Sequence, residues 1–397
     1  MSAQENKGPL SGLRVLDASI MAAGPWTAAL LGMLGAEVIK VEPPAGDGTR
    51  WAMPSQRGMG TNFIAMNVNK KDIILDLKSE EGREAAISLA RTSDIFVQNF
   101  RVGVMERLGL DYATLAAVNP RLVYCSISGF GSKGPLSKAG CGDPIMQAFS
   151  GFASLNGAEG DLAESFRFTG FLDLATASVS VQSILAALLH RNETGKGQHV
   201  EVSMLEAALE MQYTRVSELL GAGLQPAPRG SENPGFAPDR AYRALDREVF
   251  ISIVRPEQWR NFCRVLGVEV LIDDARFITN RARCENRAAL DEILEPILRA
   301  KPSVWWLRAL GRVDIACTIG QTYESFRHHR QIFENGMMAE VTTPQWGTVT
   351  VGGLPWSFSA TPCEVRAPSI PGADTEAILS GLGGAEDVSD RKLEASR

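Results

Sequence analysis

Apolar and polar positions in the first third of the chain follow two alternating patterns. Short runs of consecutive apolar residues, typical of strands buried on both faces of a sheet, are separated by amphipathic segments typical of helices. The predicted strands are Leu13–Ala18, Glu37–Val41, Asp72–Leu77, Asp94–Gln98 and Leu122–Ile127. The helices predicted between them include Pro25–Leu34 and Ser79–Arg91. This alternation predicts an α/β fold with a parallel sheet that is covered on both faces.

The pattern changes in the second half of the chain. The elements predicted there are a helix over 174–190, a strand over 199–203, a helix over 205–220, a strand over 248–253, mainly helical structure over 257–325, a hairpin of 338–343 with 348–352, and a helix from about residue 374. Residues 221–238 are rich in Gly, Pro and polar side chains, which indicates a linker. After Gly383 the chain becomes polar, which predicts a frayed tail.

Composition is that of an ordinary soluble globular protein. The chain has 397 residues, 45% of them hydrophobic and 22% charged, and is long enough for a large core. Its net charge of −6 argues against nucleic acid as a partner. We find no apolar run long enough to predict a membrane span, and the polar N-terminus lacks a signal-peptide core. We therefore expect a cytoplasmic protein without a membrane partner.

Cysteines and histidines give no indication of a metal site. The six cysteines are scattered without a CxxC pair, which is typical of reduced thiols in a cytosolic protein. None of the four histidines has a spacing suited to metal binding. We expect no metal centre and no tightly bound cofactor.

Nucleotide-binding motifs are also missing or misplaced. Residues 129–134 fit the GxGxxG pattern after a predicted strand. The dinucleotide fingerprint requires a helix directly after the glycines, but Pro135, Gly140, Gly142 and Pro144 follow here and indicate a loop. No GxxxxGK[ST] loop is present, so chemistry driven by ATP lacks its usual site.

The most informative single residue is Asp173. It lies between apolar residues where the 174–190 helix begins, and burying an uncompensated carboxylate is costly. We expect the free N–H groups and the dipole at the helix start to keep Asp173 ionised. The residues alone leave two interpretations, a helix cap or a nucleophile. For Asp143 and Gln147 we favour ordinary loop hydrogen bonding over a role as polar partners of a site.

At this point the chain resembles the family III CoA-transferases over nearly its whole length. The segments that carry the resemblance are 10–17, 23–25, 34–42, 67–70, 76–78, 94–109, 128–131, 147–151 and the turn Thr194–Gln198. Their joint order and spacing make the resemblance specific. In this family the aspartate that matches Asp173 is the nucleophile.

The resemblance implies an enzyme with a ping-pong mechanism. It implies that CoA moves from an acyl-CoA thioester to a free carboxylic acid, including dicarboxylates, through an aspartyl mixed anhydride and an aspartyl-CoA thioester. Carried onto matching positions, the CoA site is Met21, Ala22, Leu75, Lys78, Asn99, Phe100 and Arg107. We expect Arg50, Lys70 and Lys71 to add positive charge for the CoA phosphates. The glycine-rich segments near Gly151 and over 230–235 are candidate oxyanion donors.

Three departures from the formyl-CoA transferases of this family bear on the substrate. Ala22 and Pro43 stand where those enzymes have a glutamine and a basic residue, and their run of four glycines in the small-domain loop is absent, leaving only scattered Gly230 and Gly235. We therefore expect an acid larger or more apolar than oxalate. Two alternatives stay open: an acyl-CoA racemase or epimerase of the same fold, and a non-catalytic subunit of a heteromeric CoA-transferase. Racemases of the family have a histidine where Gly142 stands here.

The resemblance also implies an interlocked homodimer of two threaded rings. The expected large domain is Rossmann-like, with CoA-binding and catalytic residues in 1–220. Residues 221–330 form a linker and a smaller α+β domain. Residues 331–397 return to complete the large domain and end in the tail.

Overall fold

The computed structural model of this chain describes residues 8–52, 54–56, 59–158, 164, 170–343 and 346–382. The chain forms two compact units, each with its own core. The larger unit takes residues 1–152, 165–224 and 331–397. The smaller unit takes residues 153–164 and 225–330.

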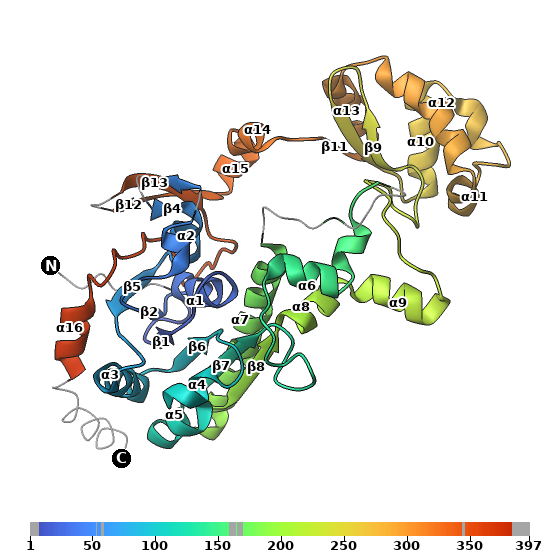
Figure 1. The fold of residues 1–397 in the computed structure, drawn as a ribbon. Coiled ribbons are helices and arrows are strands. Elements are labelled where there is room, and N and C mark those ends of the chain that lie inside the picture. Colours follow the sequence, from blue (N-terminus) through green and yellow to red (C-terminus); the bar gives the residue numbers. More distant parts are fainter. Residues whose placement is uncertain are drawn as a thin grey trace. The chain divides into compact units, whose positions relative to one another are not determined.

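The larger unit is built on a six-stranded sheet in the order β5-β2-β1-β6-β7-β8 (Figure 1). All five neighbouring pairs run parallel. The strands are β1 (Arg14–Asp17), β2 (Glu37–Glu42), β5 (Lys70–Ile74), β6 (Ile95–Gln98), β7 (Val123–Ser128) and β8 (His199–Ser203). This is the Rossmann strand order, which reverses between β1 and β6 and places ligands at the carboxyl ends of these two strands. The predicted Rossmann-like α/β fold is confirmed.

Helices cover both faces of this sheet, because successive residues of each strand point to opposite sides. On one face Val15, Val97 and Cys125 pack in a core with α1 (Ala23–Met33) and α7 (Phe171–Thr194). On the other face Leu16 and Phe96 pack with α3, α4 and α5. Those three helices span Glu80–Arg91, Val104–Leu108 and Tyr112–Val118. Burial of the strands on both sides explains their continuous apolar runs.

Helix α7 corrects one expectation from the sequence. It has 24 residues and is long and apolar enough, by length and composition alone, to cross a membrane. In the structure α7 packs against α1, β7 and β8, and Val181, Ile184 and Leu188 lie in the sheet core. Core packing therefore explains why α7 is so apolar.

A helix predicted over 205–220 is divided in two. Helix α8 (Met204–Met211) and helix α9 (Tyr213–Ala222) meet at Gln212, which is buried. The Gln212 side-chain amide donates to the carbonyls of Ala208 and Ser150 at 3.0 and 3.3 Å. The bond to Ser150 is a tertiary contact at the break, and the apolar pattern of the sequence does not reveal it.

The smaller unit has the predicted α+β character. Its antiparallel sheet has the order β11-β10-β9, with strands Ala316–Ile319, Glu248–Ser252 and Asp239–Arg243. Its longer helices are α10 (Pro256–Leu266), α12 (Arg287–Arg299) and α13 (Ser303–Gly311), with the shorter α11 (Asn280–Glu285) and α14 (Tyr323–Arg327). The segment 257–325 is mainly helical as predicted, but it also contains strand β11, which the sequence pattern did not reveal. Only four residues long, this strand is fixed by pairing with β10.

Residues after 330 return to the larger unit. Helix α15 (Arg330–Glu334) precedes the predicted hairpin, formed by β12 (Met338–Thr343) and β13 (Gly347–Gly352). The hairpin packs on α2 (Thr61–Met66), near the short strands β3 (Ser55–Gln56) and β4 (Met59–Gly60). The chain then follows the β5 edge, where Ser369 and Asp374 donate backbone hydrogen bonds to the carbonyls of Lys70 and Asp72. Helix α16 (Thr375–Ser380) follows, and its Ile378 and Leu379 pack against one sheet core.

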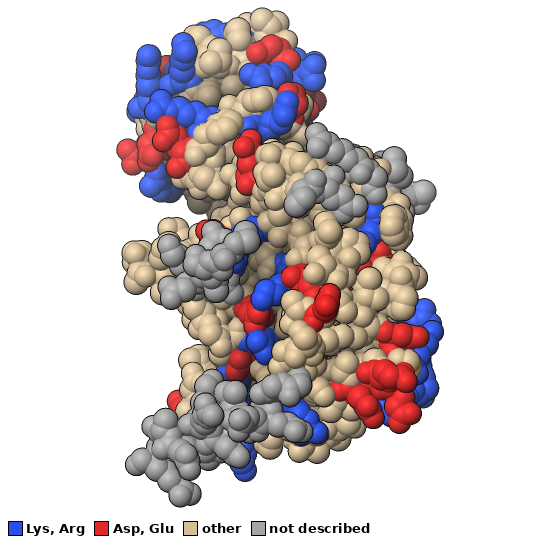
Figure 2. Space-filling view, turned by 90° about the vertical axis from the view of Figure 1, so that its left-hand side faces the viewer, with Lys and Arg blue, Asp and Glu red and all other residues tan. Residues whose placement is uncertain are grey.

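Charged side chains are mixed in sign on the face shown in Figure 2. Lys and Arg side chains alternate with Asp and Glu side chains there, and the described residues of this face form no extended basic area.

Candidate active site

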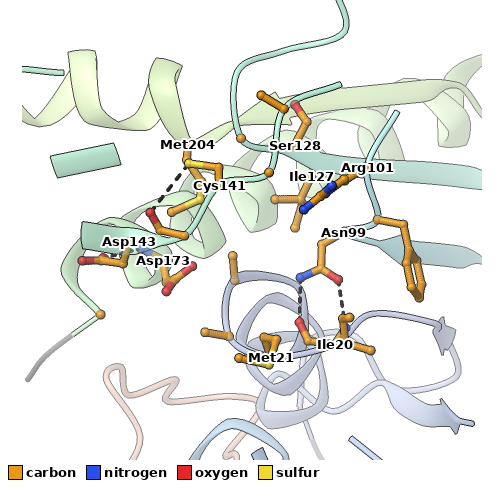
Figure 3. Close-up of a pocket in the computed structure, with 18 of the residues that line it drawn as sticks. Ile20, Met21, Asn99, Arg101, Ile127, Ser128, Cys141, Asp143, Asp173 and Met204 are labelled. Atoms are coloured by element: carbon orange, nitrogen blue, oxygen red, sulfur yellow. Dashed lines mark hydrogen bonds between the residues drawn. The ribbon is translucent and has the colours of Figure 1, made fainter. Parts of the chain in front are cut away.

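A cavity of about 710 Å³ opens at the carboxyl ends of β1 and β6, within the larger unit. Its walls come from the loop after β1, the first turn of α1, the loop after β6, the end of β7, residues 137–144 and the start of α7. Figure 3 shows Asp173, Asp143 and Cys141 at one end of this cavity, with Met21, Asn99 and Arg101 opposite. The cavity thus lies at the reversal of strand order, where doubly wound sheets bind ligands.

Asn99 joins the two loops that follow β1 and β6. Its side-chain oxygen accepts from Ile20 N at 2.8 Å, and its side-chain nitrogen donates to Ile20 O at 2.7 Å. Gln98 fixes the backbone of Phe100, because the Gln98 side-chain oxygen accepts a hydrogen bond from Phe100 N at 2.8 Å. The polar residues at the end of β6 therefore set the shape of the cavity wall.

A buried ionic network holds the β1 loop from behind. Lys40 Nζ donates to Ser19 O at 3.0 Å and to Asp47 Oδ2 at 3.2 Å. The same Asp47 oxygen accepts from Met21 N at 3.2 Å. Met21 has a φ of 68°, in the left-handed region that few side chains adopt, so these bonds hold it against its backbone preference.

Arg50 and Lys70 belong to this network and are fully or almost fully buried. Arg50 pairs with Glu42 and Asp72 at 2.6 and 2.9 Å, and Lys70 pairs with Asp17 at 2.7 Å. The expectation that they add charge for CoA phosphates is therefore wrong, because burial and internal pairing occupy them. Lys71, also expected to help, is exposed and pairs with Glu37 at 2.6 Å.

Asp173 is the third residue of α7 and lines the cavity. Among the described residues, no hydrogen bond reaches its carboxylate. The amides expected to stabilise that carboxylate bind Asp143 instead: Asp143 Oδ2 accepts from Leu172 N at 2.6 Å and from Asp173 N at 3.2 Å. The interpretation of Asp143 as an ordinary loop hydrogen bonder is wrong, because this buried carboxylate caps the helix that carries Asp173.

The electrostatic setting of Asp173 also differs from expectation. Burial raises the pKa of the Asp173 carboxyl to about 7, and the negative charge of Asp143 adds to that rise. The expected stabilisation of the ionised form by the helix start is therefore wrong. A carboxylate with a raised pKa is more basic, and hence more nucleophilic when ionised, than an ordinary aspartate.

Five of the residues predicted for the site line the cavity together. They are Met21, Ala22, Asn99, Phe100 and Asp173. Three others do not line it: the Leu75 side chain packs in the sheet core, while Lys78 and Arg107 are exposed. Their CoA contacts stay a prediction. Pro43, a position of departure from the family, is exposed.

Sequence reasoning missed several residues of the cavity wall. Arg101, Ser128 and Cys141 line the cavity, as do Thr49, Asn62, Met66, Ile127 and Met204. Arg101 had a usable signal, since it directly follows Asn99 and Phe100 at the end of β6. Asn62, Met66 and Met204 had none, because they come from helices whose placement depends on tertiary packing.

Three further expectations concern the oxyanion donors, the racemase histidine and metal binding. The amides of Gly230 and Gly235 donate to Gly157 O at 2.8 Å and to Asn233 Oδ1 at 2.9 Å, so these candidate oxyanion donors are already bound. Gly142 lines the cavity, and no histidine stands among its described lining residues. In the part of the chain that the structure describes, no group of three or more His, Cys, Asp or Glu side chains could hold a metal ion.

Comparison with known proteins places the chain in one enzyme family. The family model described as CoA-transferase family III matches residues 10–376. The acetyl-CoA:oxalate CoA-transferase of Acetobacter aceti is 36% identical over 310 residues, which cover 78% of this chain and 80% of that protein. The succinyl-CoA:glutarate CoA-transferase of Mus musculus is 33% identical over 376 residues, covering 94% and 86%. The crystal structure of a CAIB/BAIF family protein from Brucella suis matches with a TM-score of 0.84 at 32% identity, covering 95% of this chain and 100% of the other.

Proposed function

The chain belongs to CoA-transferase family III, and from that membership we propose that it moves CoA from an acyl-CoA thioester to a free carboxylic acid with Asp173 as the covalent carrier. The observation that carries the proposal is the setting of Asp173. Its carboxyl group lies at a cavity wall, has a raised pKa and accepts no hydrogen bond from any described residue. Such a carboxylate is available to attack a thioester.

The proposed reaction is a chain of four acyl transfers. An Asp173 oxygen attacks the thioester carbonyl, the carbon–sulfur bond breaks, and CoA thiolate leaves behind a mixed anhydride. The thiolate then attacks the Asp173 carbonyl carbon, which gives an aspartyl-CoA thioester and releases the first acid. A second carboxylate attacks the carbonyl carbon of that thioester, the carbon–sulfur bond breaks, CoA thiolate leaves, and a second anhydride forms on Asp173. CoA thiolate attacks its acyl carbonyl, so the new acyl-CoA and free Asp173 result.

We further propose that the acid is larger than oxalate, with dicarboxylates such as succinate and glutarate as first candidates. Two of the relatives above are named for oxalate and for glutarate. The cavity wall of this chain combines apolar side chains, among them Met66, Ile127 and Met204, with one described cation, Arg101. The apolar part suits methylene groups, and Arg101 suits an anionic group of either the acid or CoA.

Transfer is favoured here over the two alternatives. A racemase of this fold would remove an α-proton between two acid/base groups, and the position of its histidine is held by Gly142 in this cavity. A non-catalytic subunit would not need the buried Asp143 cap that fixes the Asp173 turn. α-Deuterium uptake into an acyl-CoA in the absence of an acceptor acid would favour the racemase instead.

The proposed function is tested by mass spectrometry of CoA products. Purified protein is incubated with succinyl-CoA, glutaryl-CoA or acetyl-CoA and each of several mono- and dicarboxylic acids. We expect at least one new acyl-CoA to form with the parallel double-reciprocal lines of a ping-pong mechanism. Absence of exchange across the panel would contradict the proposal, and intersecting lines would contradict its covalent route.

We propose that the protein is a cytoplasmic homodimer. All six cysteines are free thiols, as is usual in a reducing compartment. Large apolar side chains on α8 and α9 are exposed, including Leu209 (50%), Tyr213 (71%) and Leu220 (79%), and a second copy would bury them. Light scattering after size exclusion is expected to give twice the 42.9 kDa chain mass, and a stable monomer would contradict this.

A further inference from the structure

Two carboxylates stand together at one end of the cavity, and the proposed chemistry uses one of them. Asp173 faces the cavity, while Asp143 is 5% exposed and lies beside it at the start of α6 (Asp143–Phe149) (Figure 3). Burying a second negative charge next to a nucleophile is costly, so its position needs a reason.

The hydrogen bonds of Asp143 connect it to the backbone that carries the nucleophile. Its Oδ2 binds the amides of Leu172 and Asp173, the second and third residues of α7. The residue before the helix, Gly170, has no side chain and a left-handed φ of 53°, so no local cap is present. A carboxylate from another helix thus takes the role that an Asp or Ser at the helix start usually has.

The remaining oxygen of Asp143 is fixed as well. Its Oδ1 accepts a short hydrogen bond from the side-chain nitrogen of Gln147, which is fully buried one turn later in α6. With both oxygens bound, the Asp143 carboxylate has one orientation. The first turn of α7, and the direction in which Asp173 leaves it, are therefore tied to α6.

We propose that Asp143 is a positioning residue for Asp173, which aims the nucleophile through the Leu172 and Asp173 amides and holds a second negative charge beside it. This inference rests on the proposed CoA transfer, since it concerns how the same carboxylate is made reactive. Capping the helix would not by itself require a negatively charged side chain. Many helix starts are capped by neutral side chains, as Ser79 caps α3 and Ser203 caps α8 in this chain.

The charged and titratable groups facing Asp173 are few. In the described cavity wall they are Asp143, Cys141 and Arg101. Burial raises the pKa of the Cys141 thiol, and both carboxylates raise it further, so Cys141 is neutral near pH 7. After burial, the negative charge of Asp143 is what raises the pKa of the Asp173 carboxyl.

The pH dependence follows from the sign of that shift. Asp173 attacks as a carboxylate, so kcat/KM is expected to fall tenfold per pH unit below a pKa of about 7 in the wild type. Asp143→Asn keeps an oxygen for the two amides but removes the charge. The acid limb is then expected to move to lower pH, by roughly one unit.

Asp143→Ala separates aiming from charge. It also removes the negative charge, but it leaves the amides of Leu172 and Asp173 without their acceptor. We expect the same shift of the acid limb together with a plateau kcat roughly tenfold or more below that of Asp143→Asn, because a misaligned nucleophile slows the chemical step. If Asp143→Asn retains the kcat that Asp143→Ala loses, Asp143 acts by positioning Asp173.

Asp111→Asn is the matched control. Asp111 caps α5 through the amide of Thr114 and lies outside the lining of this cavity. Its replacement removes one negative charge from a helix cap without touching α7. The acid limb of this control is expected to stay at the wild-type pH.

The experiment combines pH–rate profiles of the four proteins with a ¹³C-NMR titration of aspartate carboxyls, in which the Asp173→Asn spectrum identifies the Asp173 signal. An Asp143→Asn acid limb unchanged from wild type, or equal plateau rates for Asp143→Asn and Asp143→Ala, would overturn the inference. So would an ordinary pKa of Asp173 in the wild-type titration, a result that needs no Asp143 variant to fold. Failure of the proposed function itself would appear differently, as absence of exchange by the wild type.

Discussion

Asp173→Ala is expected to abolish CoA exchange, with a loss of about 10⁴-fold or more in kcat. The reason is covalent: without the carboxylate there is no acceptor for the acyl group and no group to carry CoA between the two acids. Substrate binding should change little, because Met21, Asn99 and Phe100 still line the cavity. Product formation is followed by mass spectrometry, and acyl-CoA binding by calorimetry.

Asp173→Asn is the isosteric companion, and it distinguishes lost chemistry from lost structure. Since the folded-state pKa of Asp173 is raised to about 7, the folded protein holds this proton more tightly than the unfolded chain. The stability contributed by that proton is lost as pH rises from about 4 to 7. The asparagine variant should therefore be inactive yet at least as stable as the wild type at pH 8.

Trapping adds an independent check of the same prediction. Hydroxylamine is expected to inactivate the wild type only after acyl-CoA has been added, and to leave a hydroxamate on Asp173. Turnover by Asp173→Ala within about tenfold of the wild-type value would rule out the covalent role.

Arg50→Met is expected to lower the free energy of unfolding by about 3–5 kcal/mol. The Arg50 guanidinium is fully buried, and it binds Glu42 at 2.6 Å and Asp72 at 2.9 Å. It also stacks on the Phe63 ring, 3.7 Å from the ring centre. Methionine fills the volume but leaves two buried carboxylates without their cation. Urea unfolding followed by circular dichroism measures the change.

The two carboxylates that Arg50 binds have pKa values shifted in opposite directions. Burial and the hydrogen bond to Glu42 raise the pKa of Asp72, whereas the bonds from Arg50 outweigh burial and lower the pKa of Glu42. Loss of Arg50 should therefore lower the free energy of unfolding more at pH 8 than at pH 5, because the unpaired carboxylates are more fully protonated at pH 5.

Arg83→Met is the control for this second prediction. Arg83 and Glu80 form an exposed pair on α3 at 3.9 Å, and such pairs contribute about 0–1 kcal/mol. A loss for Arg50→Met no larger than that of Arg83→Met would show that the network is dispensable. Asp47 links this ionic network to Met21 in the cavity wall. Arg50→Met is therefore expected to weaken acyl-CoA binding as well as to lower stability.

Much of the architecture could be read from the sequence because it depends on local patterns. Apolar runs bounded by turn residues gave the parallel strands, and amphipathic periods gave the helices that cover them. Asp173, Asn99 and Phe100 were identified because they lie in fixed positions relative to these elements and resemble a family pattern. The four-residue β11 was missed, since short strands depend on a partner strand that the local sequence does not name.

What the sequence by itself determined is the fold class, the family and the residue that we propose as the nucleophile. Tertiary structure decided how that residue is held. The sequence suggested that the α7 start would keep Asp173 charged, yet the amides there bind Asp143, a residue 30 positions away. It suggested that Arg50 and Lys70 would meet phosphates, yet both are buried in ion pairs. Hydrogen-bond partners and burial depend on which distant segments meet, and that is set by packing of the whole chain.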